Sequence, residues 1–204
     1  MRLPCLLLLS AAPLAAATVE GVITYQRAPS AGALAWVPGV TRAAASAAPV
    51  IDQKDKVFTP AVLAVRPGAT ITLRNSDSIQ HNAYASDKAA EVTLDTGLNA
   101  PASETPIKVD WTAGKVVRFG CKIHPSMQVW IAALDTDAWA VPVAAEAEKT
   151  VRFTIADVPA DAARVAVWTS KYGQVEIDHA SGTGSGQLGP ADKPAATITA
   201  TRRP

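Results

Sequence analysis

The sequence predicts an all-β protein built from short strands. Val, Ile and Thr gather in short apolar runs, such as residues 62–65 and 129–134, which is typical of strands. The chain also contains 15 prolines and 12 glycines, which separate these runs with turns. The strongest helix signal, at residues 144–149, is too short to be stable in isolation. Strands at this spacing favour a β-sandwich.

The N-terminal segment, residues 1–17, has the pattern of a secretory signal peptide. Arg2 precedes an apolar run at residues 3–9, and the segment ends in three alanines. A transmembrane anchor is the alternative, but it needs about 20 apolar residues, more than this run offers. We expect cleavage before Thr18, a periplasmic or secreted protein, and no membrane span after cleavage.

Alternating patterns in the middle of the chain predict two hairpins. Residues 62–65 and 69–75 flank an Arg-Pro-Gly turn, and residues 105–111 and 115–119 flank a Thr-Ala-Gly turn. A loop over residues 75–78 precedes a short strand that begins at His81. Residues 129–134 are expected to form a further strand.

Cleavage of the signal would leave few residues able to bind a soft metal ion. Cys5 and Met1 would be lost, so Cys121 and Met127 would be the single cysteine and the single methionine. A lone cysteine outside the cytoplasm cannot form an internal disulfide. Such a thiol is either buried and inert or held as a thiolate by a metal.

The segment from Cys121 to Met127 places possible metal ligands at every third position. It reads Cys-Lys-Ile-His-Pro-Ser-Met, so His124 lies midway, and His81 offers a fourth ligand from the earlier strand. Two imidazoles, a thiolate and a weak thioether form the ligand set of an electron-transfer copper site. Individually, these histidines are compatible with a surface position and Met127 with core packing. Their concentration in one short segment favours metal binding.

These residues resemble those of the cupredoxins. The resemblance covers about residues 48 to 135, and its most specific parts are His81-Asn82 and the segment Cys121-x-x-His124-x-x-Met127. The further matching segments are Val50-Ile51-Asp52-Gln53, Phe58-Thr59-Pro60, Val65-Arg66-Pro67-Gly68 and Asn75-Ser76-Asp77.

The short loop between His124 and Met127 is similar to that of amicyanin. The chain also resembles bacterial cupredoxin-like proteins often labelled "methylamine utilization protein". The resemblance implies a Greek-key β-sandwich with one mononuclear type 1 copper held by His81, Cys121, His124 and Met127. It also implies that Asn82 ties the His81 strand to the Cys121 loop and so orients the ligands.

The flanks of this segment resemble a carboxypeptidase-regulatory-like β-sandwich. Residues 19–23 and 31–39 are similar to its start, and residues 151–159 and 165–168 are similar to its end. Thr150-Val151-Arg152 stands where similar proteins have a glycine, and Thr169 stands where they often carry a histidine. We therefore expect a discontinuous sandwich over residues 18–45 and 140–180, with a copper domain at 46–139 inserted into it. Two sandwiches in tandem are the alternative.

The segment 181–204 contains Gly-Ser-Gly and few large apolar residues, and we expect a flexible tail there. His179 lies beside this segment without other ligand types at suitable spacing, and is interpreted as a surface residue.

Charge restricts the classes of partner. The formal net charge is +1, and loss of Arg2 with the signal would make it zero. A chain without net positive charge gives no electrostatic reason to expect binding to nucleic acid. Residues 48–135 carry nine basic and nine acidic side chains, so a weakly charged encounter is expected. We expect a one-electron carrier for periplasmic redox proteins. The resemblance to the cupredoxins implies that His124 is the electron port and that Pro125 lies on the docking surface.

Two other classes of function stay open at this stage. A copper storage, delivery or sensing protein would use the same ligands. A surface-binding module would use Trp36 and Trp168 as ligand platforms, although tryptophans in β proteins are more often core residues. An enzyme is not expected, because copper oxidases need a second copper and only His179 remains to bind one.

Overall fold

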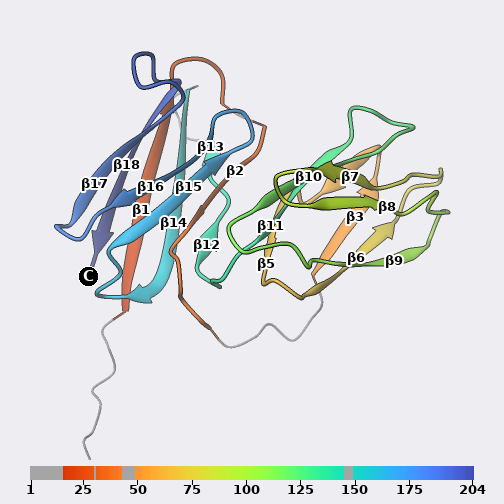
Figure 1. Ribbon diagram of the computed structural model, residues 1–204, viewed down its shortest axis with the longest axis horizontal. Helices are drawn as coiled ribbons and strands as arrows, with labels where there is room; N and C mark the ends of the chain where they lie inside the picture. The colour runs from red at the N-terminus through yellow and green to blue at the C-terminus, as the bar shows by residue number, and fades with distance from the viewer. Residues whose placement is uncertain (1–15, 30, 43–48, 145–148) are drawn as a thin grey trace, which may run out of the picture.

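The computed structural model describes residues 16–29, 31–42, 49–144 and 149–204, and these residues form strands, turns and loops (Figure 1). This confirms the all-β prediction. Among the described residues, no helix is long and apolar enough to span a bilayer. The expected signal peptide lies outside the described residues except for Ala16 and Ala17, which begin the first strand. The expected domain boundary between residues 45 and 46, and most of the helix signal at 144–149, also lie outside them.

The middle of the chain forms two facing sheets, which we call the inserted sandwich. Their strand orders are β4-β3-β6-β9 and β5-β11-β10-β7-β8. The strands are β3 (Val50–Lys54), β4 (Val57–Thr59), β5 (Val62–Val65), β6 (Thr70–Asn75), β7 (Tyr84–Asp87), β8 (Val92–Asp95), β9 (Glu104–Lys108), β10 (Val116–Gly120) and β11 (Gln128–Ala133). Alternation places every second residue inside, as in β6, where Ile71 and Leu73 are buried and Arg74 is exposed.

Both ends of the described chain form two further sheets, which we call the terminal sandwich. Their strand orders are β13-β14-β1-β18-β17 and β12-β2-β15-β16. The strands are β1 (Ala16–Tyr25), β2 (Ala33–Trp36), β12 (Trp139–Ala140), β13 (Val143–Ala144), β14 (Thr150–Pro159), β15 (Arg164–Thr169), β16 (Gly173–Asp178), β17 (Thr183–Leu188) and β18 (Ala196–Arg203). A core of residues such as Ile23, Phe153 and Ile198 lies between these sheets.

The two expected hairpins in the middle of the chain are wrong. Strand β5 pairs in parallel with β11, whereas β6 pairs with β3 and β9 in the opposite sheet. Likewise β9 lies in the β6 sheet, whereas β10 pairs with β11 and β7. The turns at residues 66–69 and 112–115 therefore carry the chain from one sheet to the other. Alternation defines which face of a strand is buried, but it does not define the partner strand.

The expected flexible tail at residues 181–204 is also wrong. Strands β17 and β18 pair with each other, and β18 pairs with β1 along eight residue positions. Leu188, Ala196, Ile198 and Ala200 are buried in the core of the terminal sandwich. Two of these four residues are alanines, so the segment packs into the core with few large apolar residues.

The two sandwiches pack against each other through a tryptophan-rich layer between β2, β5, β11 and β15. Trp36, Trp130, Leu34 and Leu134 belong to one buried cluster, and Trp168 packs partly buried against it. The rings of Trp130 and Trp168 are 6.3 Å apart. A side chain at Gly32 would meet the Trp130 ring at 2.9 Å, so the absence of a side chain there permits this close packing. Trp36 is therefore a packing residue with almost no surface to offer a ligand.

Arg66 connects two segments that run between the sandwiches, one around Val40 and one at residues 135–137, which we call the crossing segments. Its guanidinium donates to both carboxylate oxygens of Asp137, at 3.0 and 2.8 Å. It also donates to the carbonyl oxygens of Asp135 and Val40, at 3.0 and 3.1 Å. Paired with Arg66, Asp137 has its pKa held below its usual value. This arrangement links the turn after β5 to both crossing segments.

Candidate metal centre

Two loops of the inserted sandwich bring His81, Cys121 and His124 together. His81 lies before β7, where its backbone pairs with Asn99 in an isolated bridge. Cys121 and His124 lie in the loop that joins the antiparallel strands β10 and β11. One ligand atom from each of the three residues lies within 4.8 Å of the others. Among the described residues, this is the one group of three or more His, Cys, Asp or Glu side chains at such spacing.

The distances within this cluster suit a single ion. Nδ1 of His81 lies 3.0 Å from Nδ1 of His124, and Sγ of Cys121 lies 3.9 Å from the same His124 atom. With bonds of about 2.05 Å to nitrogen and about 2.3 Å to sulfur, those distances correspond to angles of about 95° and about 125° at one ion. Two nitrogen lone pairs this close repel each other unless a proton or a cation lies between them. The three ligand atoms therefore have the chemistry and the spacing that one metal ion can use.

His81 is held in place by Asp77, a residue that sequence reasoning missed. Nε2 of His81 lies 3.0 Å from Oδ2 of Asp77, and the histidine is fully buried. The hydrogen bond to His81, followed by that from the Lys56 backbone, lowers the pKa of Asp77. An ionised Asp77 accepts a hydrogen bond from the Nε2–H of His81, which leaves the Nδ1 lone pair of His81 for the cluster. An acidic residue four positions before a candidate ligand is the sequence signal for this pair.

His124 is the more accessible histidine of the two. Its side chain is half-buried, and it is flanked by the exposed residues Ile123 and Pro125. Burial, followed by the electrostatic effect of the neighbouring His81, lowers the pKa of His124. The imidazole is therefore neutral near pH 7, which is the form that binds a metal ion.

Met127 ends the same loop. Its backbone N–H donates to the carbonyl of His124 at 2.9 Å, which closes the turn. Its side chain is buried in the same apolar cluster as Cys121. Burial among apolar residues keeps water from the sulfur atoms of both residues.

Asn82 connects the two ligand loops. Its backbone N–H lies 3.4 Å from Sγ of Cys121, and its side-chain oxygen accepts a 2.7 Å hydrogen bond from the N–H of Lys122. Its side-chain nitrogen donates to Asp95 at 2.9 Å. Asp95 also pairs with the ammonium of Lys122. The residue after His81 thereby holds the residue after Cys121.

His179 was expected at the surface, and that interpretation is wrong. The residue follows β16, and its side chain is fully buried. It is covered because β17 and β18 fold back onto the sandwich, and Arg202 of β18 donates to the carbonyls of Ala162 and Ala180 beside it. Burial lowers the pKa of His179. His179 belongs to the terminal sandwich and takes no part in the cluster of His81.

No protein-family model matches this chain, and no curated protein sequence matches it. Among solved structures, a purple cupredoxin from Nitrosopumilus maritimus is similar at 19% identity and a TM-score of 0.37, over 42% of this chain and 98% of that one. A reduced variant of amicyanin is similar at 22% identity and a TM-score of 0.39, over 47% of this chain and 90% of that one. A copper-containing nitrite reductase from Thermus scotoductus is similar at 20% identity and a TM-score of 0.39, over 46% of this chain and 24% of that one.

Proposed function

We propose that this protein binds one copper ion through Nδ1 of His81, Sγ of Cys121, Nδ1 of His124 and the sulfur of Met127. The observation that carries the proposal is the cluster of the first three residues, with ligand atoms within 4.8 Å of one another. Copper bound by such residues supplies a Cu(II)/Cu(I) couple for one-electron transfer.

The donor set favours copper over zinc. Zinc sites use Cys, His and carboxylate ligands in a tetrahedral arrangement, whereas a thiolate combined with a thioether is a soft pair that suits Cu(I). Both sulfur residues, Cys121 and Met127, are buried in one apolar cluster. The carboxylate of Asp77 is engaged by Nε2 of His81 and so serves to orient a ligand.

We infer that the site relays electrons between redox proteins and catalyses no reaction of its own. His124 is half-buried at the tip of the β10–β11 loop, and Ile123 beside it has 49% of its surface exposed. An apolar rim around an accessible ligand edge suits a small and brief protein contact. The nine basic and nine acidic residues of the segment 48–135 are consistent with weak steering.

Two buried histidines provide a matched test of the copper ligands. His81→Ala should abolish the intense thiolate-to-Cu(II) absorption at about 600 nm that trigonal sites show, whereas His179→Ala should retain it. Cys121→Ser should also lose the band, with the β-sheet circular dichroism of the folded protein preserved. An equally coloured Cys121→Ser variant would refute the thiolate ligand.

Copper storage or delivery uses the same ligands and differs in kinetics. An electron carrier should be reduced and reoxidised many times faster than it releases Cu(I) to a chelator, and stopped-flow absorption at the blue band measures both rates. Release that outpaces reoxidation by small redox partners would favour storage.

A periplasmic or secreted location and a relation to the "methylamine utilization protein" group belong to the same proposal. Mass spectrometry of the exported protein should find an N-terminus at Thr18. Ala16 and Ala17 pair with Pro159 and Val158 at the end of β1, so their removal would shorten that strand by two residues. Retention of the segment 1–17 would contradict the proposed cleavage.

A further inference from the structure

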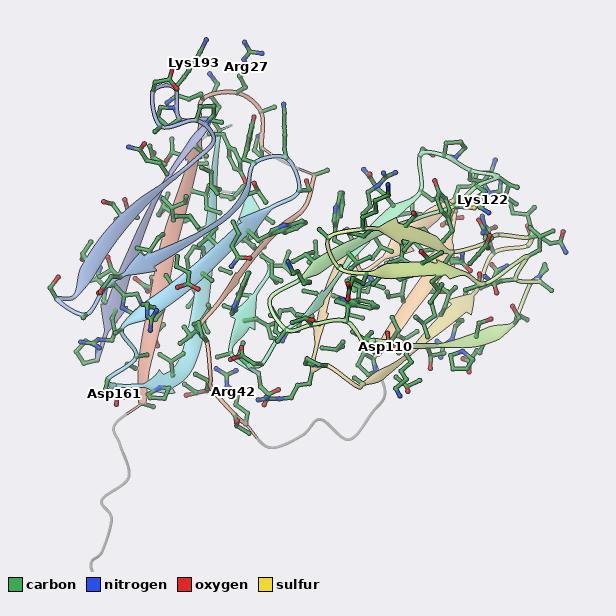
Figure 2. All side chains as sticks on the ribbon, in the orientation of Figure 1. Arg27, Arg42, Asp110, Lys122, Asp161 and Lys193 are labelled. Carbon is green, nitrogen blue, oxygen red and sulfur yellow. The ribbon has the colours of Figure 1, made fainter. Side chains whose placement is uncertain are left out.

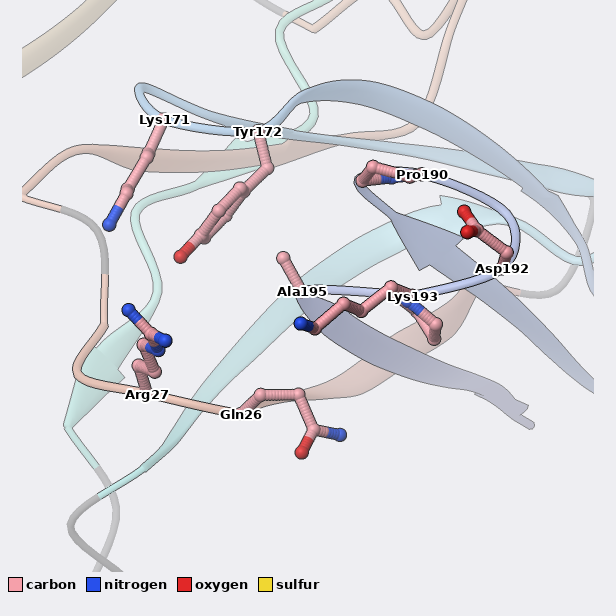
Figure 3. A pocket seen from close by; sticks show the side chains of 9 residues that line it. Gln26, Arg27, Lys171, Tyr172, Pro190, Asp192, Lys193 and Ala195 are labelled. Atoms are coloured by element: carbon pink, nitrogen blue, oxygen red, sulfur yellow. The ribbon is translucent and has the colours of Figure 1, made fainter.

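The terminal sandwich has a pocket of its own, at one end of its sheets. The pocket has a volume of about 580 Å³ and is formed by the residues that follow β1, the β15–β16 turn and the β17–β18 connection (Figure 3). Arg27, Lys171 and Lys193 surround it, and Tyr172 extends its ring between them. These three segments lie far apart in the sequence and meet only because β17 and β18 fold back onto the sandwich.

Positive charge at this pocket is unbalanced. Arg27, Lys171 and Lys193 are all exposed, and Asp192 is the one acidic residue that lines the pocket. Within the described part of the chain, none of the three cations takes part in an ion pair. Lys171 lies 5.3 Å from the centre of the Tyr172 ring, where it makes a cation–π contact. The cations are therefore available to an anion.

The rest of the pocket wall is apolar, and this wall favours anions that also have an apolar face. Tyr172, Pro194 and Ala195 are half-buried, and Pro190 completes this wall. The Tyr172 ring is supported from behind by the ring of Tyr25, whose centre lies 6.3 Å away. A small inorganic anion would leave this surface in water, whereas the flat carbon face of a sugar ring would cover it. A volume of about 580 Å³ falls within the range of sites for small organic molecules.

We propose that this pocket binds a carboxylate-bearing sugar of one or two rings, such as the terminal uronic acid of an acidic polysaccharide. Arg27 and Lys193 pair with the carboxylate, and Tyr172 and Pro194 contact the ring. The pocket lies on the terminal sandwich, at the opposite end of the molecule from Lys122, which neighbours the ligand Cys121 (Figure 2). Sugar binding would thus leave the His124 loop open to other proteins, and it does not depend on the proposed copper function.

Titration of the ¹⁵N-labelled full chain by glucuronate, glucose and inorganic phosphate, each added separately, tests this assignment by NMR. Glucuronate should shift the backbone amide signals of Arg27, Tyr172 and Lys193, and it should bind at least tenfold more tightly than glucose or phosphate. Arg27→Gln and Lys193→Gln should each weaken glucuronate binding about tenfold, the effect of losing one charged hydrogen bond. Lys108→Gln, at an exposed lysine of the inserted sandwich, is the matched control and should bind as the parent protein does.

Three results would overturn the proposal. Equal shifts with glucose would show that charge plays no part, and equal binding of phosphate would show that the apolar wall plays none. An absence of shifts at these three amides with millimolar glucuronate would show that the pocket is not a sugar site. Retained folding of the two Gln variants is read from the remainder of the same spectra.

Discussion

Replacement of Asn82 by alanine should loosen the connection between the two ligand loops. The substitution removes the side-chain oxygen that accepts from the N–H of Lys122 at 2.7 Å and the nitrogen that donates to Asp95 at 2.9 Å. The backbone N–H of Asn82, which faces the sulfur of Cys121, is unaffected. The variant therefore separates the contribution of the side chain from that of the backbone.

The expected loss of stability follows from these two hydrogen bonds. The bond to the Lys122 N–H contributes about 1 kcal/mol, and the bond to the charged Asp95 contributes about 1.5 kcal/mol. Asn82 is nearly fully buried, with 3% of its surface exposed, so water cannot replace the lost partners easily. We expect Asn82→Ala to reduce the free energy of unfolding by about 2–3 kcal/mol. Copper affinity should fall about 10- to 100-fold, because the loop that carries Cys121 becomes less ordered.

Urea unfolding of the metal-free protein, followed by circular dichroism, measures the first quantity, and competition with a copper chelator measures the second. Asp95→Asn is the control, because an amide oxygen still accepts from Asn82 while the exposed pair with Lys122 is lost. Exposed pairs contribute little, so this variant should lose less than about 1 kcal/mol. A loss below about 0.5 kcal/mol in Asn82→Ala, or equal losses in both variants, would refute the reasoning.

Three further predictions concern the rest of the molecule. Arg66→Ala should lower the free energy of unfolding by about 1–2 kcal/mol. Arg74→Ala, which removes an exposed ion pair with Glu104, should lower it by less than about 0.5 kcal/mol. Equal shifts of the two variants in thermal unfolding would contradict the role of Arg66 at the crossing segments. Trp130→Ala should lower the free energy of unfolding by about 3–5 kcal/mol and speed amide hydrogen exchange at the layer between the sandwiches. A decrease below about 1 kcal/mol would exclude that layer as a major source of stability. The pKa of His179 is lowered in the folded protein, so the unfolded chain binds more protons and stability should fall as the pH drops below about 6.5. His179→Phe should reduce this dependence in urea titrations at about pH 7.5 and 5.5, and an unchanged difference would contradict it.

Sequence reasoning recognised the metal loop because its signal is local. Cys121, His124 and Met127 lie within seven residues, in a loop whose ends are held by the β10–β11 pairing. The contact between His81 and this loop is not local, and it was expected only from a family resemblance. Asp77 was missed because one acidic residue in a polar loop does not stand out until the position of the His81 ring is known.

Strand partners and the C-terminal segment could not be predicted in the same way. The Gly-Ser-Gly composition predicts flexibility, but a side chain at Gly184 would meet the carbonyl oxygen of Asp178 at 1.8 Å. At Gly186, an added side chain would meet Ile177 at 2.9 Å. These glycines belong to β17 and allow it to approach β16 closely. Glycine for close approach and glycine for flexibility look alike in a single sequence.

The most direct test of the copper site is an anaerobic titration of the metal-free protein with Cu(II), read by its absorption spectrum. We predict a band at about 600 nm that grows linearly and stops at one equivalent. Saturation at one equivalent should coincide with loss of the free thiol of Cys121. A colourless protein, or an endpoint above one equivalent, would contradict a single copper ion held by His81, Cys121, His124 and Met127.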